Sequence, residues 1–217
     1  MKTQQRLRLI STSLFLALGG ADAVAETPNF NYSSLSLAAN VVSYDDDDDV
    51  VVRRGGGTGE VVRFSGVAGA SVGGILQFSD NLIVSVAGSA LSDEGYGVEI
   101  EESSGSLGLG YVTPIGTRTD LLFALEFVDA EVQICNLTRC STVEDSGYGA
   151  TAGMRRWVSE SIEINANVSY ADLGDLGDTT SVGAGGAYWL DGHSSITTSL
   201  SRSSDATGWS LGYRYAF

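Results

Sequence analysis

Apolar and polar residues alternate along almost the whole chain after residue 30. The C-terminal segment shows this most clearly, with Trp209, Leu211, Tyr213, Tyr215 and Phe217 at every second position and small or polar residues between them. A period of two places alternate side chains on the same face of a β-strand. The pattern therefore predicts strands that have one apolar face and one small or polar face.

Segments of this kind follow one another without a helical pattern between them. Five connections are mostly long, polar and acidic (45–58, 92–103, 132–145, 172–178 and 204–206), and those between them are short (79–80, 115–119, 159–160 and 191–193). Long connections at one end and short ones at the other predict an up-and-down antiparallel meander. The ten strand candidates are 30–44, 59–78, 81–91, 104–114, 120–131, 146–158, 161–171, 179–190, 194–203 and 207–217.

Two architectures can use such a meander: a soluble sandwich or barrel with an apolar interior, and a membrane barrel with an apolar exterior. The candidate strands are long enough to cross a bilayer, which takes about 9–11 residues. The polar face is rich in glycine and serine, which suits a crowded lumen better than an exposed surface.

Aromatic residues gather near strand ends, as in interfacial belts. Those beside the long connections are Tyr44, Phe64, Phe127, Tyr148, Tyr170 and Trp209. Those toward the short connections are Phe78, Tyr111, Trp157, Tyr188, Tyr213, Tyr215 and Phe217. The sequence therefore favours an all-β transmembrane barrel of ten strands.

The first 25 residues have the features of an export signal. Lys2, Arg6 and Arg8 precede a short apolar stretch, and Ala23-Val24-Ala25 matches a cleavage site. The prediction is a signal peptide over 1–25 and a single barrel domain over 26–217. An exported chain meets oxidising conditions, so we expect the two cysteines, Cys135 and Cys140, to form a disulfide in the third long connection.

The charge balance is strongly acidic. The 12 Lys and Arg residues face 27 Asp and Glu residues, a net charge of −15, which argues against a nucleic-acid partner. Asp45, Asp46, Asp47, Asp48 and Asp49 form one run in the first long connection. Such carboxylates can gather divalent cations, but the run lacks an EF-hand pattern, and a solvated, self-repelling loop is the preferred interpretation.

The C-terminus carries a family resemblance. The ending Gly212-Tyr213-Arg214-Tyr215-Ala216-Phe217, together with the runs 106–111, 119–126, 147–156 and 163–173, is similar to the outer-membrane β-barrel domain family of small porin-like and opacity-like proteins. It resembles OmpA-type barrels in plan, and many relatives have eight strands, which is the alternative strand number. The resemblance implies a location in the outer membrane of a Gram-negative cell, in contact with lipid and lipopolysaccharide. We expect the protein to be a monomer. The resemblance also implies that Tyr213, Tyr215 and Phe217 form the signal read by the outer-membrane assembly machinery.

Several charged residues share the inward parity of the terminal strand: Arg63, Glu126, Arg155, Glu163 and Arg214. The short turn at 159–160 should bring Arg155 and Glu163 close together. A charge in a narrow lumen needs a partner, because desolvation is costly. Two interpretations stay open, an internal ion-pair network that braces the barrel and a charged constriction in a small channel.

Other candidate chemistry is weak. Gly55-Gly56-Gly57 lacks the Lys-Ser/Thr ending of a phosphate loop. His193 and Ser195 have the spacing used by a lipid A deacylase barrel, but His193 falls in a short connection, on the wrong side for lipid A. We expect no enzyme activity, no cofactor and no metal. The function predicted is a narrow porin-like channel or an envelope-structural role, with surface interaction through the acidic connections as the alternative and lipid A modification as a third hypothesis.

Overall fold

The computed structural model describes the backbone of residues 32–53, 59–95, 97–136 and 139–217. Side chains are described in these ranges except at 46–53, 59–63 and 175. The predicted export segment 1–25 and the glycine run 55–57 lie outside the described residues. So do the side chains of Arg63 and of Asp46 to Asp49.

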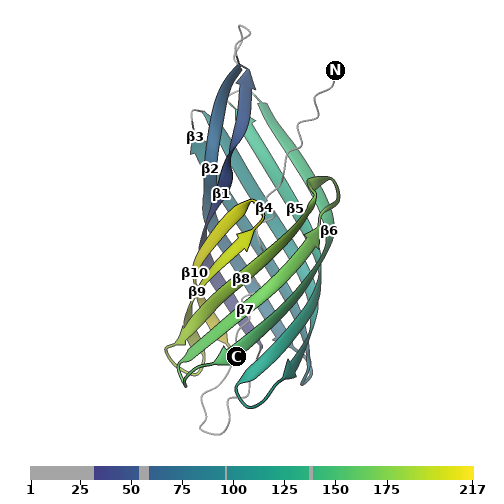
Figure 1. Ribbon diagram of the computed structural model, residues 1–217, viewed down its shortest axis with the longest axis vertical. Helices are drawn as coiled ribbons and strands as arrows, with labels where there is room; N and C mark the ends of the chain where they lie inside the picture. Colours follow the sequence, from purple (N-terminus) through teal and green to yellow (C-terminus); the bar gives the residue numbers. More distant parts are fainter. Residues whose placement is uncertain (1–31, 54–58, 96, 137–138) are drawn as a thin grey trace.

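The chain forms a closed barrel of ten antiparallel strands (Figure 1). Each strand pairs with its sequence neighbours, and β1 closes the sheet against β10 with Ser34 opposite Ala216. The predicted fold class and strand number are therefore confirmed. The strands are β1 Ser34–Arg53, β2 Gly59–Gln77, β3 Leu82–Gly95, β4 Val98–Pro114, β5 Thr119–Asn136, β6 Arg139–Trp157, β7 Ile162–Asp172, β8 Asp178–Trp189, β9 Ser194–Ser203 and β10 Ala206–Ala216. One short 3-10 helix, η1, spans Gly174–Leu176 between β7 and β8.

The strands differ in length, which corrects the sequence interpretation of the long connections. Segments predicted as loops at 45–58, 92–103 and 132–145 consist largely of strand, because the hairpins β1–β2, β3–β4 and β5–β6 continue their pairing past the ends of β7–β10. Pairing of β1 with β10 ends at Tyr44, and pairing of β6 with β7 begins at Tyr148. The continued parts of β1–β6 (45–53, 59–66, 92–95, 98–105, 128–136 and 139–147) form a raised wall on one side of the barrel (Figure 1).

Glycines stand at the level where the raised wall begins. A Cβ added at Gly147 would lie 1.7 Å from the carbonyl oxygen of Asp172, and one at Gly66 would lie 2.1 Å from that of Val42. Both contacts are with backbone that a side chain cannot displace cheaply. Glycine at these positions therefore lets β6 and β2 pass close to their neighbours.

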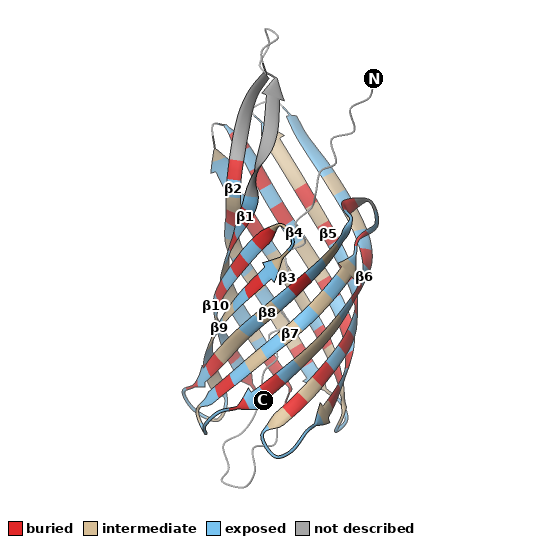
Figure 2. Cartoon of the chain, in the orientation of Figure 1, coloured by how far each residue is buried: buried red, intermediate tan, exposed pale blue. Residues whose placement is uncertain are grey.

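Large apolar side chains are exposed on the outer surface of every strand. Buried and exposed positions alternate along the strands in Figure 2. Leu125, the most exposed large aliphatic side chain described, is 70% exposed, and Leu37 is 61% exposed. The middle of the inner surface carries mainly serine, glycine and asparagine. Outward aromatic residues, all more than two-fifths exposed, include Phe78, Tyr111, Phe127, Tyr148, Tyr170, Tyr188, Trp209, Tyr213, Tyr215 and Phe217.

Three aromatic residues expected in the outer belts lie inside instead. Tyr44, Phe64 and Trp157 are 7%, 1% and 6% exposed. Their parity explains this, because Tyr44 continues the inner face that Val42 begins and Trp157 continues that of Arg155. Where the raised wall begins, an apolar cluster fills the space between the strands: Val42, Tyr44, Phe64, Val67, Leu91, Val98, Ile100, Val132 and Ala206.

Within the described residues, no helix has the length and apolar character needed to cross a membrane.

Candidate functional site

The inner face of the barrel near its short turns holds a buried charged cluster. The turn between β6 and β7 is fixed by the hydrogen bond from the Val158 amide to the Ile162 carbonyl (2.9 Å) and by the Ser159 hydroxyl, which accepts from the Ile162 amide (3.1 Å). The turn pairs Trp157 with Glu163 in the register. Arg155 and Glu163 consequently point into the lumen at nearly the same height.

Glu163 is the centre of this cluster. Its Oε2 accepts hydrogen bonds from Arg155 Nη2 at 2.6 Å, from Arg214 Nη2 at 3.0 Å and from Trp189 Nε1 at 3.2 Å. These donors come from β6, β10 and β8. Glu163 is 0% exposed, and Arg155 and Arg214 are each 1% exposed. The structure thus brings together three of the charged residues that the sequence placed in the lumen.

The cluster continues across the lumen to β5. The guanidinium carbon of Arg155 lies 5.0 Å from the centre of the Tyr32 ring, within cation–π range. The Tyr32 hydroxyl donates to Asp120 Oδ2 at 2.8 Å. On the other side, the Arg214 guanidinium lies 4.8 Å from the centre of the Trp189 ring. We call these residues the lumenal plug: Tyr32, Asp120, Arg155, Glu163, Trp189 and Arg214.

The lumenal plug is balanced in formal charge. Arg155 and Arg214 face the carboxyl groups of Glu163 and Asp120. Charges this deeply buried persist only when each is paired and hydrogen-bonded, because each loses its hydration. Since the contacts join β10 to β7 and Tyr32 to β5, which are not sheet neighbours, they bridge the lumen instead of lining one wall.

Sequence reasoning missed three members of the lumenal plug. Asp120 has the same inward parity on β5 as Glu126, so counting back in steps of two would have found it. Trp189 shares the inner face of β8 with Ala187. Tyr32 lies in the predicted strand 30–44 and has the parity of Ser34, but its place beside Asp120 depends on closure of the barrel.

Two lumen candidates stand apart from the plug. Glu126 lies on the inner face of β5 and is 7% exposed, and its Oε1 has no hydrogen-bond partner among the described residues. Arg63 belongs to β2 opposite Asp49 in the register, and its side chain is not among those described.

The predicted disulfide is present. Cys135 and Cys140 are bonded near the tip of the β5–β6 hairpin, where they are direct register partners. The bond lies within a continued strand pair of the raised wall and not in a free loop.

The acidic residues do not gather into a metal site among the residues that the structure describes. Asp45 instead accepts two hydrogen bonds from Arg202, which ties β1 to β9 near the rim. On the raised wall, Glu94 stands opposite Glu99 and Glu131 stands opposite Glu144 in the register. Like charges placed directly opposite one another weaken a sheet.

His193 lies in the turn between β8 and β9, at the end of the barrel that holds the plug. Its Nδ1 is 3.0 Å from the Ala216 carbonyl oxygen. In the same turn, the amides of His193 and Ser194 both donate to Asp191 Oδ1 at 2.7 Å, and these bonds lower the pKa of Asp191 from its usual value. His193 is thus part of a turn that closes against the C-terminal strand.

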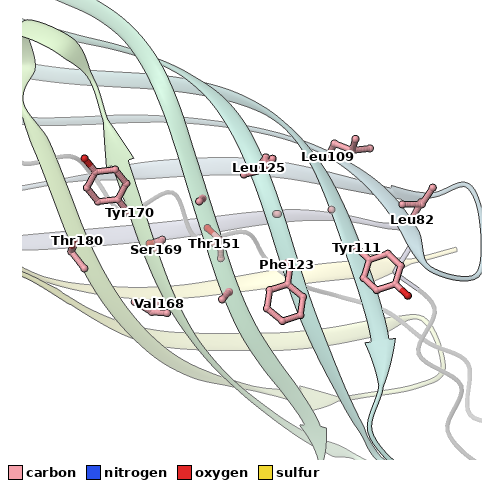
Figure 3. Close-up of a pocket in the computed structure, with 14 residues that line it drawn as sticks. Leu82, Leu109, Tyr111, Phe123, Leu125, Thr151, Val168, Ser169, Tyr170 and Thr180 are labelled. Carbon is pink, nitrogen blue, oxygen red and sulfur yellow. The ribbon is translucent and has the colours of Figure 1, made fainter.

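A shallow apolar groove of about 510 Å³ lies on the outer surface (Figure 3). Its floor includes the small residues Ala150 and Ala152 of β6, and larger residues such as Phe123 and Tyr170 stand beside them on the neighbouring strands. The groove therefore results from a change in side-chain size on the apolar exterior.

Comparison with known proteins gives structural likeness only. No family model matches the chain, and no curated protein is similar to it. Among solved structures, it is similar to Ail, the attachment invasion locus protein of Yersinia pestis (14% identity, 85% of this chain and 99% of that chain, TM-score 0.44). It is also similar to the KdgM porin (10% identity, 84% of this chain and 99% of that chain, TM-score 0.45). A third similar structure is the N-terminal β-barrel domain of Pseudomonas aeruginosa OprF (13% identity, 85% of this chain and 98% of that chain, TM-score 0.40).

Proposed function

We propose that this protein is a small outer-membrane β-barrel with an envelope-structural role, and that its lumen does not conduct. The lumenal plug carries the proposal. Its contacts run from Arg214 through Glu163 and Arg155 to Tyr32 and Asp120, and so they cross the lumen between strands that are not neighbours. This arrangement favours the bracing network over the charged constriction.

The membrane location is supported by the reversed polarity of the barrel. A soluble barrel buries its large apolar side chains, whereas here residues such as Leu37, Leu107 and Leu125 are more than half exposed. Continuous apolar surface on this scale marks contact with lipid or protein, and an apolar band around a barrel with a polar interior is the pattern of outer-membrane barrels. The export signal predicted from the sequence agrees with this location.

The C-terminal strand fits the proposed route of assembly. Tyr213 and Tyr215 on the outer face of β10, and Phe217 directly after it, are each about half exposed. They are thus available to the assembly machinery and, after insertion, to the lipid around the end of the barrel that carries the short turns. We infer that this strand is the assembly signal and that the inserted protein is a monomer.

Conductance across planar lipid bilayers tests the proposal. The wild-type barrel should produce no regular current steps, because the plug bridges the lumen. A variant in which Arg155, Glu163 and Arg214 are all replaced by Ser should produce small steps, since it removes both buried cations together with their shared carboxylate. Folding of both proteins is checked by heat-dependent gel mobility. Regular ohmic current steps from the wild-type protein would refute the structural role and would favour the channel hypothesis instead.

The raised wall favours a second candidate, a surface interaction protein. Strands β1–β6 are longer than β7–β10, although the shorter strands also complete the barrel. A disulfide joins the two strands near the tip of the β5–β6 hairpin. The outward carboxylates of the raised wall suit a cationic partner surface. Replacing 130–145 with a two-residue turn should leave barrel assembly intact and abolish attachment of expressing cells to polylysine-coated surfaces. Unchanged attachment at equal surface levels would remove this candidate.

A further inference from the structure

Glu126 is a buried carboxylate that the lumenal plug does not use. It is 7% exposed, and none of the described hydrogen bonds or ion pairs includes it. Its Oε1 is sealed from solvent and has no hydrogen-bond donor. A buried ionised carboxylate without compensation is strongly unfavourable, so either a bound cation or a proton must neutralise Glu126.

Glycine and serine residues surround Glu126 on the inner face. Its register partners are Gly108 on β4 and Gly149 on β6, neither of which has a side chain to cover it. A Cβ added at Gly108 would lie 3.0 Å from Glu126 Cγ and 2.5 Å from Ser85 Oγ. Glu126 and Ser85 therefore approach each other over Gly108.

A second unsatisfied oxygen lies on the same inner face. Ser106, two residues from Gly108 on β4, has a buried hydroxyl with no hydrogen-bond partner among the described residues. Ser106 is the diagonal cross-strand neighbour of Glu126, and such neighbours have Cα atoms about 7–8 Å apart. A bound ion between two side chains at this spacing can contact an oxygen from each.

The charge of the site selects the kind of ion. The arginines of the plug already face Glu163 and Asp120, so they leave no counter-charge for Glu126. One carboxylate with neutral hydroxyls carries a single negative charge, whereas calcium sites gather six to eight oxygen ligands and usually several carboxylates. Oxygen ligands alone are hard ligands that suit alkali-metal ions.

We propose that Glu126, with the hydroxyls of Ser106 and Ser85, forms a lumenal binding site for one small monovalent cation such as Na⁺. Gly108 has no side chain to come between Ser85 and Glu126, since a Cβ at this position would collide with both. The site is separate from the plug and does not require that the plug close the lumen.

Sodium-23 NMR on the purified full-length barrel in detergent micelles tests this site. The wild-type protein should broaden the Na⁺ signal, and added K⁺ should reverse the broadening whereas choline should not. Glu126→Gln should lose this excess broadening. Glu160→Gln, which removes an exposed carboxylate in the β6–β7 turn, should retain it. Equal broadening by wild type and Glu126→Gln would overturn the proposal.

Infrared difference spectra provide a second, independent readout. A protonated Glu126 would give a carboxylic-acid band in the wild-type protein at neutral pH that is missing in Glu126→Gln. If a cation balances Glu126, this band should be absent from the wild-type spectrum. The presence of that band would mean that a proton neutralises the side chain, and would overturn the cation site. Should Glu126→Gln fail to fold, Ser106→Ala keeps the test decisive, because it should weaken Na⁺ binding and leave the fold intact. Unchanged Na⁺ binding in Ser106→Ala would then count against the site.

Discussion

Replacing Glu163 with Gln should destabilise the barrel by about 3–5 kcal/mol, the range for breaking a buried ion pair by removing one partner. Oε2 of Glu163 accepts from Arg155, Arg214 and Trp189. A neutral amide leaves two buried guanidinium groups facing only one carboxyl group in the plug, that of Asp120. It also offers an N–H₂ group where these donors need an acceptor.

Urea-induced unfolding in lipid vesicles measures this loss as a lower midpoint at unchanged slope. Glu160→Gln is the matched control, because it makes the same chemical change in the exposed turn three residues away and should shift the midpoint little. An unchanged midpoint for Glu163→Gln would show that Glu163 does not hold the buried arginines in place. Arg214→Met should cost less than Glu163→Gln, since Arg155 still neutralises Glu163.

The barrel itself could be predicted because its main signal is local. Alternation with a period of two sets the inner and outer faces of a strand wherever that strand lies in the sheet. The alternation within each strand therefore assigned Arg155, Glu163 and Arg214 to the lumen without a structure.

The ends of the strands were predicted less accurately than the strands themselves. The density of acidic residues and the apolar–polar alternation gave conflicting signals there. Val98 and Ile100 alternate with Glu99 and Glu101, and the structure buries the two apolar residues and exposes the two acids. The density of acidic residues indicated a loop, whereas the alternation indicated a strand. Cross-strand pairing with β3 and β5 makes the alternation prevail.

Two further features were missed for different reasons. Trp157 was assigned to a belt from its nearness to a turn, although its parity with Arg155 already placed it inside. The contact between Tyr32 and Asp120 joins residues 88 positions apart. It exists only because β1 closes the barrel against β10, which brings the start of the chain's first strand across from β5.

A charge placed on the apolar exterior should also destabilise the barrel strongly. Leu125→Arg should destabilise the protein by about 2 kcal/mol or more, because an arginine on the lipid-facing side of a barrel costs about 2–4 kcal/mol near the bilayer midplane and less toward its edges. Leu125 is 70% exposed and lies two residues below Phe127, on the side away from the raised wall. Were the protein soluble, an exposed leucine would accept arginine with a change within about 0.5 kcal/mol.

Reversible unfolding in vesicles should therefore rank three variants of the outer surface. Leu125→Ala controls for the lost side chain and should have a smaller effect than Leu125→Arg. Thr142→Arg places the same charge at an exposed outward position on the raised wall, where water reaches it, and should leave the midpoint nearly unchanged. If Leu125→Arg and Thr142→Arg proved equally harmless, the apolar exterior would not face lipid. The exposed leucines would then have to be covered by protein, because water alone would leave their apolar surface uncompensated.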